Sequence, residues 1–144
     1  MRERDRGYEE FIADLAGGLR YSPRLGKKWS ANWRYDLGAY ALISPAAVSD
    51  KEGVERGRVS YDIEFTLLKC HSQKDIMAIS MLWNDVKRDA MEIVHELERS
   101  PLVLATTELE IEPLSLQISN YDEVAVQVSA TMVSNYIAGG DGSL

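Results

Sequence analysis

The chain has 144 residues, of which 45% are hydrophobic, and a chain of this size and composition builds one core without disulfide bonds or a metal ion. Its net charge of −7 argues against tight wrapping of nucleic acid, because phosphate binding depends on clustered lysine and arginine. The lone cysteine excludes an internal disulfide, the mixed charges at the N-terminus are unlike a signal peptide, and no apolar run approaches the roughly 20 residues that cross a bilayer.

The N-terminal third predicts one helix and one strand. Apolar residues recur at helical spacing over residues 8–19. Residues 21–32 lack periodicity and are expected to form a connecting loop. The first strand is expected over residues 33–43, with Gly38 at a bulge, and the polar residues 48–58 are expected to form an exposed loop.

The middle of the chain carries the strongest patterns. Strict alternation over residues 59–67 predicts a half-buried strand. Apolar residues then keep a 3.6-residue period over residues 76–97, before Pro101, and this predicts a helix of about 35 Å. Ser72 and Asp75 resemble a capping box at the start of that helix.

The C-terminal third predicts two more strands. Residues 103–111 alternate, the apolar phase flips at Pro113, where a bend or bulge is expected, and residues 124–132 supply a returning strand. The expected fold is α+β: a mostly antiparallel four-stranded sheet with the element order α-β-β-α-β-β, covered on one face by the long helix and the short N-terminal helix. We expect a single intracellular domain over residues 1–138 and a flexible tail over residues 139–144.

The residue types of catalytic and metal sites are few and poorly placed. Cys70 and His71 are neighbours on a predicted strand, so their side chains are expected to point to opposite faces and not to form a thiolate–imidazole pair. His95 and Glu96 resemble the start of an HExxH zinc motif, but Arg99 stands where the second histidine belongs. No catalytic, cofactor-binding or metal-binding residue is therefore predicted. An enzyme whose site combines Cys70, His71 and the glutamates between 108 and 112 stays an open alternative.

A basic and aromatic segment, residues 20–35, contains no acidic residue. Arginine, tryptophan and tyrosine dominate the hot spots of protein interfaces, so this segment is a candidate site for an acidic patch on an identical neighbour. A solvated loop and a site for single-stranded nucleic acid are the alternatives. The candidate interface residues are Arg20, Arg24, Lys27, Lys28, Trp29, Trp33 and Arg34.

A second constellation consists of carboxylates on the polar faces of two predicted strands: Asp62, Glu64, Glu108, Glu110 and Glu112. If the two strands are neighbours, these charges crowd one face and need water, counterions or the cations of a partner. A solvated face is one interpretation. The others are a subunit interface with basic residues, and the wall of a channel in which like charge keeps passing DNA from sticking.

A strand such as Tyr61–Leu68 that runs into a helix such as Trp83–Val94, followed by a hairpin with a Glu-Pro step at 112–113, forms a connected pattern. On these residues, the stretch from Tyr61 to Tyr136 resembles the tail-completion or tail-terminator (head–tail connector) proteins of tailed bacteriophages. The N-terminal helix and the aromatic-rich first strand also look like this family. At the start of the last strand, Val124 and Ala125 replace the glycine and tryptophan that the family would have there.

The resemblance implies a non-enzymatic virion subunit, without cofactors, that forms a ring at the head–tail junction or the top of the tail. Identical subunits and the neighbouring neck and tail-tube proteins are the implied partners, DNA is only passing cargo, and no membrane is involved. The implied location is the virion, and the host cytoplasm during assembly. Two alternatives remain: a small intracellular α+β module that binds a peptide or ligand, and another tail component such as a tube or baseplate subunit.

Overall fold

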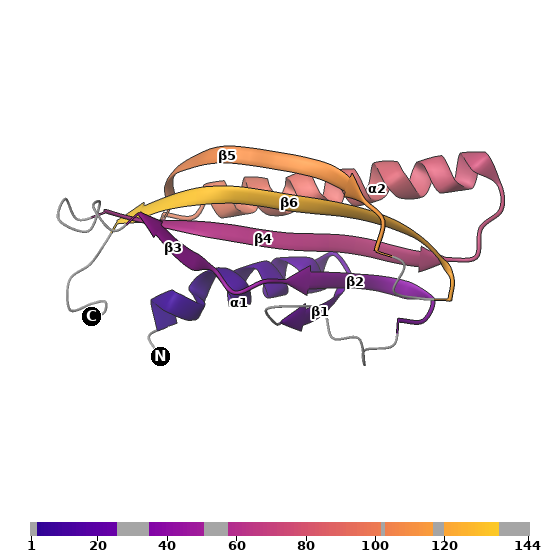
Figure 1. Cartoon of the computed structure of the whole chain (residues 1–144), viewed down its shortest axis with the longest axis horizontal. Coiled ribbons are helices and arrows are strands. Elements are labelled where there is room, and N and C mark those ends of the chain that lie inside the picture. Colours follow the sequence, from indigo (N-terminus) through magenta and orange to yellow (C-terminus); the bar gives the residue numbers. More distant parts are fainter. Residues whose placement is uncertain (1–2, 26–34, 51–57, 102, 117–119, 136–144) are drawn as a thin grey trace.

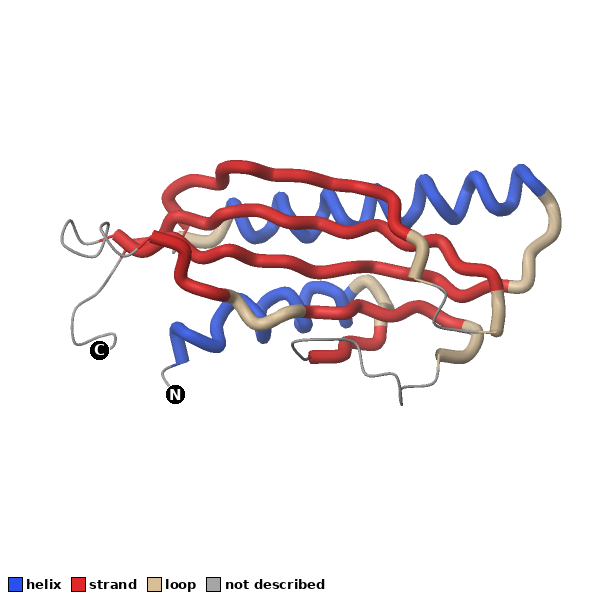
Figure 2. Tube along the Cα trace, viewed as in Figure 1, coloured by secondary structure: helices blue, strands red, loops and turns tan. Residues whose placement is uncertain are grey.

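The computed structural model describes residues 3–25, 35–50, 58–101, 103–116 and 120–135 of the chain. These residues form two helices and six strands, which are joined by loops and turns (Figures 1 and 2). In chain order the elements are α1 (Glu3–Gly18), β1 (Ser22–Leu25), β2 (Gly38–Ile43), β3 (Ala47–Asp50), β4 (Arg58–His71), α2 (Ile76–Glu98), β5 (Val103–Leu114) and β6 (Asp122–Asn135).

The described strands form one sheet in the order β1-β2-β4-β6-β5, and β3 pairs with β4 beyond the end of β2. Strands β4 and β6 are antiparallel along their whole length, from Arg58 opposite Asn135 to His71 opposite Asp122. Strand β5 is antiparallel to β6, whereas β1 runs parallel to β2. The sheet is therefore mixed, and β5 forms one of its edges.

The predicted four-stranded sheet with the element order α-β-β-α-β-β is wrong, because the sheet has six strands. The two additional strands, β1 and β3, each have four residues; β1 lies inside the segment 21–32 and β3 overlaps the start of the segment 48–58, both of which were predicted as loops. Strand β4 is longer than β2, and the part of its edge that β2 leaves open pairs with β3. Such short strands form because a neighbouring backbone offers hydrogen bonds, and their own side chains give no periodic signal.

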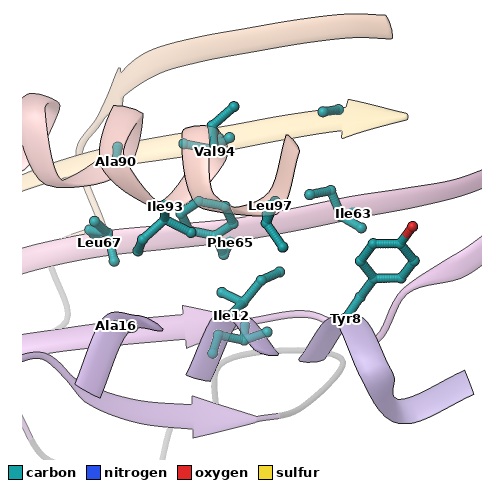
Figure 3. Close-up of a cluster of buried hydrophobic side chains, with 14 of the residues drawn as sticks. Tyr8, Ile12, Ala16, Ile63, Phe65, Leu67, Ala90, Ile93, Val94 and Leu97 are labelled. Carbon is teal, nitrogen blue, oxygen red and sulfur yellow. The ribbon is translucent and has the colours of Figure 1, made fainter. Parts of the chain in front are cut away.

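One face of the sheet packs against both helices. The alternation along β4 turns Ile63, Phe65 and Leu67 toward this face, where Ile12 of α1 and Ile93 of α2 meet them (Figure 3). All five side chains are almost fully buried. Burial of an aliphatic or aromatic side chain contributes about 1.5–3 kcal/mol, so this layer is the main source of stability that the described residues show.

Two hydrogen bonds between buried side chains lie inside this layer. The hydroxyl of Tyr21 donates a hydrogen bond of 2.7 Å to the buried carboxylate of Asp89 on α2. Burial, followed by the hydrogen bond and the charge of Asp89, raises the pKa of Tyr21 far above its ordinary value. The hydroxyls of Tyr8 on α1 and Ser134 on β6 also form a hydrogen bond. These contacts fix both helices on the sheet.

The opposite face of the sheet has an apolar half, which we call the outer apolar patch. Its buried residues are Tyr35, Leu42, Leu68, Cys70 and Ala125, and Tyr40, Leu114 and Leu116 pack against them. The patch explains the phase flip at Pro113. That residue pairs regularly with Val126, and Leu114 with Ala125, so the predicted bend or bulge at Pro113 is wrong. Strand β5 keeps its phase there, and the outer face changes from charged to apolar.

Helix α2 packs more deeply in its second half than in its first. Its fully buried residues begin at Val86, whereas Ile79, Leu82 and Trp83 of the first half are only partly buried against the core. Figures 1 and 2 show this first half continuing past the end of β5. The N-cap is Asp75, which makes no side-chain cap hydrogen bond, so the predicted capping box with Ser72 is wrong.

Candidate functional site

The face of the sheet opposite the helices carries the predicted carboxylates. Strand β6 lies between β4 and β5, so the two acidic strands are not neighbours. The register places Glu64, Ser129 and Glu110 in one row across the three strands, because paired residues of antiparallel strands point to the same face. Hydroxyl groups of β6 thus separate the acidic side chains of β4 from those of β5.

Thr131 of β6 links the two acidic strands. Its hydroxyl oxygen lies 2.8 Å from Oδ1 of Asp62 and 3.3 Å from Oε2 of Glu108. A threonine hydroxyl has a single hydrogen, so it donates to only one of these carboxylates at a time. The two negative charges therefore compete for one donor on an exposed surface.

A β-bulge in β5 brings Glu108 within reach of Thr131. The pairing shifts between Thr107 and Glu110, and Glu108 has a positive φ of 52°. Bulges commonly redirect a side chain near functional surfaces, and a positive φ is uncommon for a residue with a Cβ atom. The backbone at Glu108 is therefore held in a strained conformation where it contributes to the acidic face.

A hollow of about 460 Å³ lies on this face and is lined by Asp62, Glu64, Glu108 and Glu110. The other described lining residues come from β3, β4, β6 and the segment between β2 and β3, and none of these is basic. We call the four carboxylates and this hollow the acidic groove. Glu112 is opposite Gln127 and does not line the groove, because it lies toward the outer apolar patch.

The acidic groove attracts cations and repels phosphates, but its geometry does not make a metal cage. The described residues contain no group of three or more histidine, cysteine, aspartate or glutamate side chains placed to hold a metal ion. The groove is also too polar to be the largely apolar pocket that a small organic ligand generally occupies.

The basic and aromatic segment is described only at its ends. Arg20 is exposed with a φ of 73°, and Arg24 lies in β1, 5.4 Å from the ring centre of Tyr40. The Arg24 guanidinium donates to Ser22 Oγ at 2.7 Å. Strand β1 and the acidic strand β5 are at opposite ends of the strand order. The other five predicted interface residues lie outside the described residues: Lys27, Lys28, Trp29, Trp33 and Arg34.

Cys70 and His71 do not form a catalytic pair. Cys70 is buried in the outer apolar patch, whereas Nδ1 of His71 accepts a hydrogen bond of 3.1 Å from the backbone N–H of Gln73. Their side chains point to opposite faces of β4, which is the geometry predicted for strand neighbours. His95 is exposed on α2.

Comparisons with known proteins gave no match, either among protein-family models or among curated sequences. Neither described helix is long and apolar enough to span a membrane.

One exposed surface, at the start of α2, was not predicted from the sequence. Of the residues that the 3.6-residue period predicted to pack on the sheet in the first half of α2, Ile79, Leu82 and Trp83 are partly buried against the core, whereas Ile76 is highly exposed. Met77 and Met81, which lie outside that stripe, are also highly exposed. The sequence carries one signal for this surface: residues 76–83 contain more apolar residues than a helix needs for the single stripe that covers a sheet.

Proposed function

We propose that the chain is a structural subunit of a tailed-bacteriophage virion and forms a ring at the head–tail junction or the top of the tail. The observation that carries this proposal is the acidic groove, which neither described helix covers because both pack on the opposite face of the sheet. The resemblance to tail-terminator proteins, which rests on the order of a strand, a long helix and a C-terminal hairpin, also supports this proposal.

In such a ring, the acidic face lines the central passage. Carboxylates on the wall repel DNA phosphates, so that DNA passes without being retained. The partners are identical subunits and the neck and tail-tube proteins on either side, and DNA is cargo without a specific site. A ligand-binding module is less well supported, because the groove is polar and its described lining residues include no basic or aromatic group to orient a ligand.

The mass of the purified protein over a range of concentrations tests ring formation, with negative-stain images of any large species. We expect a single closed oligomer whose mass is a whole multiple of the 16.2 kDa chain. A monomer at every concentration contradicts a subunit that forms rings by itself.

The role of the acidic face is tested separately with a double variant, Asp62→Lys with Glu64→Lys. Rings of this variant are expected to bind linear double-stranded DNA at least about tenfold more tightly than unaltered rings at low salt, because phosphate binding scales with the cations presented. The matched control, Asp14→Lys with Glu92→Lys, changes the net charge equally on the helices. Equal DNA binding by both variants contradicts an acidic face turned toward DNA.

A further inference from the structure

The first turns of α2 present an apolar surface that the described chain leaves uncovered. Ile76, Met77 and Met81 are 78%, 74% and 64% exposed, and residues 76–84 contain no charged side chain. We call these nine residues the α2 overhang; Ile79, Leu82 and Trp83 on its inner side pack partly buried against the core. A helix that is apolar around most of its circumference is normally buried, and methionine-rich surfaces are typical of docking sites.

A hollow beside the α2 overhang adds a positive charge to this surface. It has a volume of about 400 Å³ and is lined by Trp83, Lys87 and Pro113, together with Ser80 and Asn84. Within the described part of the chain, Lys87 forms no ion pair, whereas the nearby Arg88 pairs with Asp85 at 3.3 Å. The α2 overhang therefore suits a partner surface that is apolar and acidic.

Strand β5 of the same chain has this composition. Leu104 and Leu109 are 46% and 38% exposed, and the exposed Glu108 and Glu110 lie beside Leu109 on this edge of the sheet. Figure 1 shows that β5 begins at the opposite end of the long axis from the α2 overhang. The two surfaces are different parts of the chain, so a contact between them joins two copies head to tail.

We propose that the α2 overhang docks on the β5 edge of a second copy of this chain, with its apolar residues against Leu104 and Leu109 and with Lys87 facing Glu108 and Glu110. The apolar overlap drives the association, and the opposite charges set its orientation. Repetition of a heterologous contact closes into a ring when the rotation per copy allows it. The inference rests on the proposed ring and names the surfaces that join its subunits.

Complementation between two blocked variants tests this contact. The first variant, Met77→Asp with Met81→Asp, blocks the α2 overhang, and acidic residues near a helix N-terminus do not melt the helix. The second, Leu109→Lys with Glu110→Lys, blocks the β5 edge. Each variant alone is expected to lose the oligomer, with association at least about tenfold weaker. An equimolar mixture is expected to form a dimer and nothing larger, because each mixed pair retains one intact junction.

Matched controls use the outer surface of α2 away from the overhang. Met91→Asp repeats the first type of change at a methionine that is 49% exposed, and Met91→Lys with Glu92→Lys repeats the second. Both controls are expected to keep the mass of the unaltered protein. Circular dichroism of every variant confirms that it is folded.

Other results overturn the inference in distinguishable ways. If the edge-blocked variant alone still dimerises, the α2 overhang pairs with itself. If the mixture yields no dimer while the unaltered protein is monomeric, the overhang serves a different protein and ring formation fails as well. If both blocked variants keep the unaltered ring, the proposed function stands and this contact is wrong.

Discussion

Tyr21 and Asp89 form the residue pair on which the interior depends most directly, since their hydrogen bond of 2.7 Å ties α2 to the segment between α1 and β1. Tyr21→Phe is expected to lower the free energy of unfolding by about 1–3 kcal/mol, because a buried carboxylate loses its donor. Urea denaturation measures this change. Tyr40→Phe is the control, because among the described residues the exposed Tyr40 hydroxyl bonds to the Asp36 backbone and to no buried charge. An equal loss in both variants contradicts the assignment.

The same pair predicts how stability depends on alkaline pH. Burial and Asp89 raise the pKa of Tyr21 above the ordinary value of about 10, so the unfolded chain releases the phenol proton first as the pH rises. The contribution of Tyr21 is therefore complete below about pH 10 and is lost above it, by about 1.4 kcal/mol per pH unit. The stability advantage of the unaltered protein over Tyr21→Phe should shrink between pH 9 and 11 in urea titrations. A constant difference across that range contradicts the raised pKa.

The backbone strain at Glu108 can be measured by comparing two substitutions in β5. At its φ of 52°, a β-branched side chain clashes with its own backbone, so Glu108→Val is expected to cost about 1–2 kcal/mol. Glu110 pairs regularly with Ser129, and Glu110→Val is expected to stay within about 0.5 kcal/mol. Thermal unfolding compares the two variants, and equal losses rule out the positive φ as the cause.

At the scale of elements, α2 contains two halves that respond differently to the same substitution. Ile93 is fully buried against the sheet, whereas Ile76 is 78% exposed. Ile93→Ala is expected to lower the free energy of unfolding by about 2–5 kcal/mol, and Ile76→Ala by no more than about 0.5 kcal/mol. Urea denaturation of the monomeric form measures both. A comparable loss at Ile76 indicates that the chain itself covers the α2 overhang.

Elements with a strong period were predictable, and elements held by their neighbours were not. The alternation over residues 59–67 and the helical period over residues 76–97 correspond to β4 and α2. Strand β4 extends beyond its predicted end because Leu68 and Cys70 are buried on the outer face, which removes the alternation. Strands β1 and β3 were missed because four residues at a sheet edge need only a backbone partner.

The acidic groove was predictable in its residues but not in its arrangement. Alternation placed Asp62 and Glu64 on the polar face of their strand. Nothing in the sequence says that β6 lies between the acidic strands, because strand order depends on contacts that are distant along the chain. A bulge was likewise expected at Pro113, where the apolar phase of the sequence flips. The bulge lies instead between Thr107 and Glu110, where it directs Glu108 to Thr131.

At the scale of the whole molecule, charge and apolar surface are unevenly distributed, and this favours assembly over a role as an isolated chain. The carboxylates gather on one sheet face and one edge, while the apolar α2 overhang projects at the far end of the long axis. In an isolated chain, the crowded carboxylates repel one another, and the α2 overhang exposes apolar surface to water. Both costs fall when copies bury the overhang and counterions fill the passage.

The repulsive cost is open to direct measurement in the monomer. Neutralising the acidic groove with Asp62→Asn, Glu64→Gln, Glu108→Gln and Glu110→Gln is expected to raise the free energy of unfolding by about 1 kcal/mol at roughly 10 mM salt. The gain should vanish near 1 M salt, where the Debye length falls from about 30 Å to about 3 Å. A control that neutralises Asp14, Asp36, Glu92 and Glu98 changes the net charge equally but removes no crowded face, so its gain should be smaller. If the two variants gain equally at low salt, net charge and not the groove is the source of the repulsion.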